Sequence, residues 1–362
     1  MRINRIAAVS ATLALAATTA AVLPAGQAAA PQPKTLAKHL VAPLSAAVDD
    51  DGTAYVTQNF AGLLTKVRPG KKATTVYASK GGNEVGGVSV FHGKLVFTET
   101  ASDAKGNPSK SWVKWIAPSG KVRTLANVRR YENDKNPDGK VTYGVRTIDE
   151  TCAGQWPAEA GPPKYDGAKD SHPYATLQTD EGTTFVADAG MNAVITISPR
   201  GKIRTLAVLP AVPVTITAEV AGAMGLPECA VGQTYYGEPV PTDVALDDGK
   251  LVVTTEGGGL GEQMPLGSVY RVGLKSGKVK KVVGGLFAPV GVAVGRNGDL
   301  FVSQLFGGEI SRIKHGTTKV RTYAEAGLPA AVEWTSRGLY ATVDAVPPEE
   351  GAPNGKLVRF RR

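Results

Sequence analysis

The feature that most constrains the fold is a repeated pattern of four short, β-branched runs, which is clearest over residues 241–283. A turn at residues 247–250 separates the first two runs, because Gly249 supplies the positive φ that a tight reversal needs. A Gly-rich connection and a second turn at Ser276 and Gly277 separate the remaining runs. The unit predicts four antiparallel strands, and such a small sheet buries its faces only against stacked neighbours.

The same pattern occurs six times. The copies begin at Pro43, Gly87, Pro173, Pro241, Pro289 and Pro329. The last copy lacks a fourth run, but residues 34–37 resemble the fourth runs at 123–126 and 204–207. A ring whose last unit is completed by the N-terminal strand has no free edge, whereas an open sandwich needs no such match. The sequence therefore predicts an all-β, six-bladed β-propeller, with residues 31–362 as a single domain.

Residues 1–30 are predicted to be a secretory signal peptide. Arg2 and Arg5 precede a mostly apolar, Ala-rich run at 6–23, and small residues follow. Cleavage is expected near Ala28 rather than Ala30, because a cut after Ala30 would place Pro31 directly after the cleaved bond, where proline is unfavourable. A membrane anchor is the alternative, but the run is only weakly hydrophobic. We expect a secreted protein, extracellular or associated with the cell wall, without a membrane span.

Charge and cysteine content limit the partners. The formal net charge is +9, but the basic residues are spread along the chain. Attraction to an anionic wall polymer or to nucleic acid is one interpretation; a solvated surface is the one we favour, with no nucleic-acid partner. Cys152 and Cys229 are the two cysteines, and in an oxidising exterior they are most simply one disulfide.

The long insertions are predicted to share one face. Hairpin turns between first and second strands lie on one end of the blades, here called the turn face. Connections between blades, and between second and third strands, lie on the other, here called the loop-rich face. The insertions at 102–111, 127–172, 209–240, 256–267 and 344–355 all belong to the loop-rich face. The disulfide is expected to join the two longest over the channel mouth, and ordered loops of that length are usually functional.

Several runs in and beside these insertions carry a family resemblance. They are SHPYA at 171–175, FVADAGMNA at 185–193, CAVGQTY at 229–235, EPVPTDV at 238–244 and GSVYRV at 267–272, with the segments around 131–139 and Cys152. Together they resemble the ScyD/ScyE family of exported propellers. The resemblance implies a six-bladed propeller related to NHL repeats, and it implies no settled activity and no catalytic residues.

Four polar residues near the starts of inner strands are predicted to point toward the mouth: Glu84, His172, Glu238 and Asp243. Sugar-lactonase propellers bind a metal with acidic and amide ligands from separate blades, so a metal-dependent hydrolase is one interpretation. The alternative is that these acids accept hydrogen bonds from exposed backbone amides. Glu256 begins a Gly-rich loop that joins two strands without a helix, which argues against nucleotide binding and leaves Glu256 as a binding-face candidate.

The long insertions also contain aromatic residues. Trp156, Tyr165, Tyr235 and Tyr236 stand beside proline and glycine, with little strand-like alternation around them. Exposed aromatic rings there suit stacking on a sugar or on a partner protein. Packing of these rings over the disulfide is the alternative.

Residues 134–139 match the first half of a calcium loop. Asp134, Asn136 and Asp138 supply oxygen at alternate positions, but Val145 occupies the position of the distal carboxylate. The same residues form a strong turn by themselves. Calcium is therefore the one cofactor considered, and otherwise none is expected.

These observations favour a monomeric, exported propeller that binds an unknown extracellular ligand or protein through its loop-rich face, without catalysis. The first alternative is a metal-dependent hydrolase or lyase of the sugar-lactonase type in the channel mouth. A purely structural envelope protein is the second.

Overall fold

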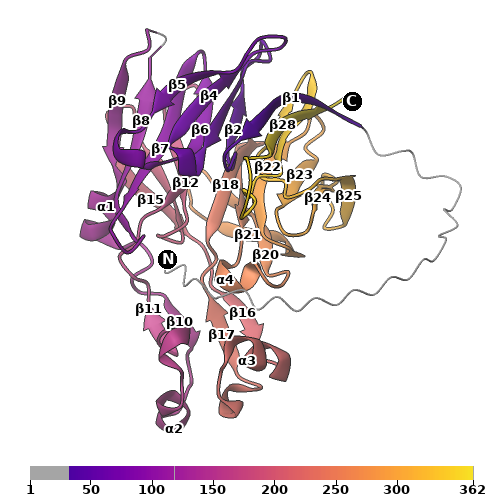
Figure 1. The fold of residues 1–362 in the computed structure, drawn as a ribbon. Coiled ribbons are helices and arrows are strands. Elements are labelled where there is room, and N and C mark those ends of the chain that lie inside the picture. The colour runs from indigo at the N-terminus through magenta and orange to yellow at the C-terminus, as the bar shows by residue number, and fades with distance from the viewer. Residues whose placement is uncertain (1–31, 118, 362) are drawn as a thin grey trace, which may run out of the picture.

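The computed structural model describes residues 32–117 and 119–361, and its described part is organised as seven four-stranded antiparallel sheets (Figure 1). The predicted signal peptide and its cleavage site lie outside these residues. Within the described part, no helix is both long and apolar enough to cross a membrane.

Six of the sheets coincide with the six sequence repeats, and we number them 1 to 6 and call them together the body. Sheet 1 contains β2 (Ala46–Val48), β3 (Ala54–Gln58), β4 (Leu63–Val67) and β5 (Thr74–Ala78). Sheet 2 contains β6 (Glu84–Phe91), β7 (Lys94–Ser102), β8 (Pro108–Ile116) and β9 (Val122–Asn127). Sheet 3 contains β12 (Pro173–Gln178), β13 (Thr184–Asp188), β14 (Ala193–Ile197) and β15 (Ile203–Val208).

The remaining three repeats follow in the same way. Sheet 4 contains β18 (Pro241–Asp247), β19 (Lys250–Thr255), β20 (Gly267–Gly273) and β21 (Val279–Leu286). Sheet 5 contains β22 (Pro289–Val294), β23 (Leu300–Gln304), β24 (Glu309–Ile313) and β25 (Val320–Glu325). Sheet 6 contains β26 (Val332–Thr335), β27 (Gly338–Val343), β28 (Gly355–Phe360) and the N-terminal strand β1 (Pro33–Leu40).

Sheet 6 is built from both ends of the described chain. Strand β1 runs antiparallel to β28, with Lys34 opposite Arg359 and Thr35 opposite Val358. Gly338, at the start of β27, has a φ of +126°, and a Cβ there would lie 2.2 Å from the carbonyl oxygen of Phe360. Only glycine lets the β26–β27 turn pass so close to β28. The N-terminal run therefore occupies the fourth-strand position that its sequence predicts.

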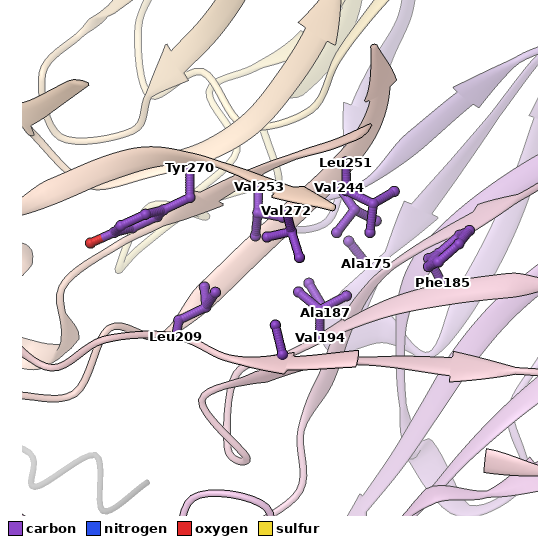
Figure 2. Packing of buried hydrophobic residues seen from close by; sticks show 11 residues of the cluster. Ala175, Phe185, Ala187, Val194, Leu209, Val244, Leu251, Val253, Tyr270 and Val272 are labelled. Atoms are coloured by element: carbon purple, nitrogen blue, oxygen red, sulfur yellow. The ribbon is translucent and has the colours of Figure 1, made fainter. Parts of the chain in front are cut away.

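The apolar core lies between neighbouring sheets rather than at one centre. Figure 2 shows the cluster between sheets 3 and 4, where Ala187 and Val194 face Leu251 and Val253. Equivalent clusters lie between each of the other neighbouring pairs, including sheets 6 and 1. The first strands contact one another in cyclic order, and together they line a channel of about 270 Å³. Because successive side chains of a strand point to opposite faces, each sheet packs against one neighbouring sheet on each of its two faces.

The two longest insertions form the seventh sheet, which we call the arm. Its strands are β10 (Thr142–Val145), β11 (Lys164–Asp166), β16 (Val212–Thr215) and β17 (Thr234–Gly237), in the order β11-β10-β17-β16. The same insertions contain α1 (Val128–Lys135), α2 (Glu150–Gly154), α3 (Ala218–Met224), η3 (Ala158–Ala160) and η4 (Glu228–Ala230). Shorter connections contain η1 (Asn59–Ala61), η2 (Lys80–Gly82) and α4 (Gly258–Gly261). The arm projects away from the body, with α2 and α3 toward its far end (Figure 1).

Two expectations about the insertions need correction. The disulfide between Cys152 and Cys229 is present, with a Cα–Cα distance of 5.8 Å, but Cys152 lies on α2, toward the far end of the arm and not over the channel mouth. The reason is that the two insertions pair as strands, which carry their distal turns outward. Half of the insertion expected at 102–111 extends β7 and β8, and residues 103–107 form the turn that remains between these strands.

Candidate functional site at the base of the arm

Glu84 and His172 come together on the loop-rich face. Glu84 begins β6, and His172 directly precedes β12. The Nε2 atom of His172 lies 2.9 Å from Oε2 of Glu84, and Asn59 donates a hydrogen bond of 2.9 Å to the other carboxylate oxygen. Both side chains are about four-fifths buried, so the pair is held with little exposure to water.

This contact sets the protonation of both groups. Burial by itself would raise the pKa of Glu84, but the charge of His172 and hydrogen bonds from His172 and Asn59 outweigh it, and the pKa is lowered. Burial would lower the pKa of His172, but the charge of Glu84 and the hydrogen bond to it raise that pKa to about 9. At neutral pH His172 is therefore an imidazolium, which cannot coordinate a metal or act as a general base.

Asp243 lines the channel, and its carboxylate accepts hydrogen bonds from the backbone. Its two carboxylate oxygens accept hydrogen bonds of 2.8 Å from the amides of Val244 and Val292, which ties sheet 4 to sheet 5. Burial raises its pKa to about 7 despite those two bonds. Farther along the channel, burial and the charge of Asp243 raise the pKa of Glu333 to about 8. Asp243 thus behaves as the alternative predicted, as an acid that accepts hydrogen bonds from backbone amides.

Glu238 belongs to a network that ties the arm to sheet 3. The hydroxyl of Tyr165 donates to its Oε1 at 3.2 Å, and the side-chain amide of Asn192 donates to its Oε2 at 3.2 Å. The same amide of Asn192 also donates to Asp138 at 2.9 Å, and the hydroxyl of Tyr143 reaches Asp138 at 3.0 Å. Of the four residues predicted to point toward the mouth, only Glu84 and His172 are thus in contact with each other.

The calcium-loop residues are not brought to one point. Asp134 is 63% exposed and lies 4.0 Å from Arg130 on the same helix, α1. Asn136 ends that helix with a φ of +40°, and its side-chain amide donates to the carbonyl of Gly167. Asp138 is buried in the network with Tyr143 and Asn192. In the part of the chain that the structure describes, no group of three His, Cys, Asp or Glu residues is arranged to hold a metal ion.

The candidate aromatic residues of the arm are all partly buried, and they differ in what they contact. Trp156 and Tyr235 pack against the small apolar cluster of the arm, which includes Val145 and Ile216. The guanidinium of Arg146 lies over the ring of Tyr236, 3.6 Å from the centroid of the ring. The alternative considered for these rings was packing over the disulfide, and Trp156 and Tyr235 both pack within the arm that carries it.

A pocket of about 590 Å³ lies at the base of the arm, and we call it the arm pocket. One wall comes from the arm, with Tyr165 and Tyr235. The opposite wall comes from the loops of sheets 3 and 4, with Gly190 and residues 257–260. Glu238 also lines the pocket, and the other acidic residues in its wall are Glu159, Asp166 and Asp170. Among the described residues, neither lysine nor arginine lines it, although the chain carries a net charge of +9.

Glu256 lies beside this pocket, at the start of the loop that contains α4. Its amide donates to the carbonyl of Val240, and a Cβ at Gly261 would lie 2.0 Å from its carbonyl oxygen, so the loop folds tightly on itself. Burial, with a smaller contribution from the charge of Glu262, raises the pKa of Glu256 to about 8. Glu256 is therefore largely protonated at neutral pH.

Sequence reasoning missed the residue that joins the network. Asn192 stands in the turn between β13 and β14 with a φ of +52°, and its side-chain carbonyl oxygen accepts from the amide of Val240. An asparagine between two predicted strands signals a left-handed turn. Nothing in the sequence signals that its side chain bridges Asp138 and Glu238.

The fold is that of a β-propeller, and solved structures of similar shape support this. The chain is similar to an aldose sugar dehydrogenase from Streptomyces coelicolor in its PQQ-bound form (TM-score 0.54, 12% identity, 90% of this chain and 96% of that chain). It is similar to a gluconolactonase from Xanthomonas campestris (TM-score 0.53, 11% identity, 94% and 99%) and to virginiamycin B lyase from Staphylococcus aureus (TM-score 0.50, 15% identity, 91% and 98%).

At these identities the likeness concerns the fold alone. No family model and no curated protein matches the sequence.

Proposed function

We propose that the protein is an exported, six-bladed β-propeller, with sheets 1 to 6 as its blades, that binds a small polar ligand in the arm pocket. The observation that carries the proposal is the pocket itself, at the junction of a rigid body and an arm that interrupts the repeats. Its volume of about 590 Å³ falls within the range of small-molecule sites.

The lining favours a ligand with hydroxyl or ammonium groups. Tyr165 and Tyr235 present aromatic surface, and Glu238 presents a carboxylate whose position is fixed by Tyr165 and Asn192. Aromatic faces beside carboxylates attract both sugars and organic cations, whereas an anionic ligand would meet four acidic side chains.

The wider predictions accompany this proposal. The disulfide is consistent with an oxidising exterior, and it supports export. Kinship with the ScyD/ScyE family, secretion and a monomeric state remain predictions from the sequence, as does the absence of a nucleic-acid partner.

The metal-dependent hydrolase or lyase is the weaker candidate. The structurally similar enzymes share the fold only, and the four residues proposed for that site are engaged elsewhere: His172 by Glu84, Asp243 by two backbone amides and Glu238 by its network. Elemental analysis of the purified protein, with and without Glu238→Ala and Asp243→Ala, tests it, and calcium belongs in the same measurement. Stoichiometric metal that is lost in either variant would favour the enzyme.

Filling the pocket tests the binding proposal. Gly259 lines the pocket, and a Cβ at this position would meet no atom within 4 Å, so Gly259→Phe can add a ring there. Gly222 on α3 has the same open space and lies outside the pocket, so Gly222→Phe is the matched control. Thermal-shift screening of neutral sugars, amino sugars and polyamines, followed by calorimetry, supplies the ligand.

We expect Gly259→Phe to weaken binding by at least about tenfold and Gly222→Phe to leave it unchanged, since an occluded pocket loses most ligand contacts. Glu238→Gln should weaken an ammonium ligand more than a neutral sugar. Equal affinity in both glycine variants, or no ligand from any class, would dismiss the arm pocket as the site.

A further inference from the structure

A second pocket, of about 260 Å³, lies between sheets 4 and 5 on the turn face, opposite the arm. Its location follows from its lining, which includes Gly298 in the first hairpin turn of sheet 5 and residues 314–318 in the turn between β24 and β25. We call it the basic pocket, because five of its lining residues are basic: Arg271, Lys280, Lys281, Lys314 and His315. No aspartate or glutamate of the described chain lines it.

The basic groups approach from both sheets. Arg271 on β20 stands opposite Lys280 on β21, so the two side chains share one face of sheet 4. That face carries Val252 and Val269, which pack against sheet 5, so Arg271 and Lys280 face sheet 5 as well. From sheet 5, His315 lies directly over Gly298, where a Cβ would be 2.5 Å from its Nδ1.

The floor of the pocket is apolar. Leu300 and Ile313 are 2% and 1% exposed and belong to the core cluster between the two sheets, together with the half-buried Val282. Thr317 and Thr318 add hydroxyl groups at the rim. The pocket thus offers cationic donors above a surface that suits the carbon skeleton of a small organic group.

The nearby carboxylates offset only part of the charge. Asp247 pairs with Arg271, and Asp299 pairs with Arg312 and accepts from the amide of His315. The charge of Lys314 also contributes to the lowered pKa of Asp299, so that lysine is partly balanced. Within the described residues, no ion pair is found for Lys280.

We propose that the basic pocket binds a phosphoryl group carried on a small organic body, such as one unit of a phosphodiester polymer or a free phosphorylated polyol. A phosphoryl group presents several charged oxygens, which matches the guanidinium of Arg271, the ammonium groups of Lys280 and Lys314, and the threonine hydroxyls that line the pocket from two sheets. The site is independent of the arm pocket, since the two lie on opposite faces and differ in charge.

A matched pair of charge reversals tests the site. Arg204 on β15 of sheet 3 occupies the position equivalent to Lys280 on β21 of sheet 4, because it pairs with Thr196 as Lys280 pairs with Arg271. Both positions are exposed. Lys280→Glu and Arg204→Glu therefore make the same charge change at matched sites. Calorimetry measures binding of glycerol 3-phosphate and of a poly(glycerol phosphate) polymer at low and moderate salt. Inorganic phosphate is the reference probe.

We expect Lys280→Glu to weaken binding roughly tenfold or more, because a charge-assisted contact becomes a repulsion, and Arg204→Glu to change it less than about twofold. Tighter binding of the polymer at equal phosphate concentration identifies the polymer as the source of the group, and equal binding identifies the free ester. Equal loss in the two variants would assign binding to net charge and overturn the proposal, as would binding of glycerol 3-phosphate no tighter than that of inorganic phosphate. His315→Ala gives a second variant if Lys280→Glu alters the melting temperature.

Discussion

The carboxyl group of Glu132 lacks a hydrogen-bond partner in the interior. It is fully buried on α1, and neither oxygen has a hydrogen-bond partner, although the Asp170 amide lies close enough to lower its pKa. Burial first, and then the charges of Asp188 and Asp138, raise that pKa to about 8 from an ordinary value of 4.5. The folded protein therefore favours the protonated form of Glu132. Once this carboxyl ionises, the folded state becomes less stable relative to the unfolded state.

The sign of the pH dependence follows from that shift. Stability associated with Glu132 is complete below pH 4.5 and is lost as the pH rises to about 8. Loss of the proton from His172, with a pKa raised to about 9 from 6.5, acts in the same direction. We expect the free energy of unfolding to fall between about pH 5.5 and about pH 8.5, by on the order of 1.4 kcal/mol for each pH unit over which one such group is protonated only in the folded state.

Glu132→Gln should remove part of that fall, because glutamine does not ionise. Asp134→Asn, on the same helix but 63% exposed, should leave it unchanged. Urea unfolding of the three proteins at both pH values makes the comparison. A stability that rises with pH, or an identical fall in Glu132→Gln, would contradict the assignment.

At this scale the sequence predicts types of residue better than contacts. Glu84 and His172 were both predicted to face the mouth, but a polar residue before an inner strand has the same sequence signal whether it meets another side chain or a backbone amide. Asp243 meets two amides, and only the folded register of sheets 4 and 5 decides this. Glu132 gives no signal at all, because a glutamate on a short polar helix is ordinarily solvated.

At the scale of elements, the repeats were predictable and the arm was not. Each repeat has β-branched alternation and a glycine turn, so its strands fall within a few residues of their expected bounds. The arm depends on β10 pairing with β17, where only Gly144 with Tyr236 and Val145 with Tyr235 are in register. Strands of three or four residues from separate insertions are too short to give a clear periodic signal, and their pairing is decided by non-local contacts.

The arm should depend on its disulfide. Its apolar cluster contains only five buried residues, which is a small core for a four-stranded sheet: Val145, Ile216, Ala221, Leu226 and Ala230. The Cys152–Cys229 bond joins the two insertions across a separation of 77 residues. Its removal should destabilise the arm by about 2–4 kcal/mol, with the body retained.

Hydrogen exchange of Cys152→Ser/Cys229→Ser measures this directly. Amides of β10, β11, β16 and β17 should lose protection, and amides of β13 and β19 in the body should keep it. The arm pocket should lose its ligand in the same variant, because Tyr165 and Tyr235 belong to these strands. Unchanged protection in the arm would show that its strand pairing and the Asn192 network keep the arm folded without the disulfide.

At the scale of the whole molecule, the two ends of the body carry opposite chemistry. Among the described residues, the arm pocket on the loop-rich face is lined by acidic residues without basic ones, and the basic pocket on the turn face shows the reverse. The basic residues are spread along the sequence, but each strand runs from one face of the body to the other, so the turns and loops at its two ends lie on opposite faces. This separation of charge can be recognised only after each turn and loop of the repeat has been assigned to one face of the body.

The integrity of the body should depend on β1. This strand covers the edge of β28, and Leu40 is 4% exposed in the cluster between sheets 6 and 1, beside Val56 and Leu357. A variant lacking residues 1–40 loses that packing and leaves β28 as an uncovered edge, which invites pairing with another chain. Compared with a variant lacking only residues 1–28, we expect a melting temperature lower by roughly 10 °C, since a buried leucine and a strand pairing are lost.

Calorimetry and light scattering measure the melting temperature and the association of the two variants. A peptide of residues 32–41 added in excess should restore the melting temperature, because it can re-form the pairing with β28, and the same peptide with Leu36→Asp and Leu40→Asp should not. If the shorter variant melts at the same temperature and remains monomeric, β1 is an accessory strand, and the last sheet is stable with three strands.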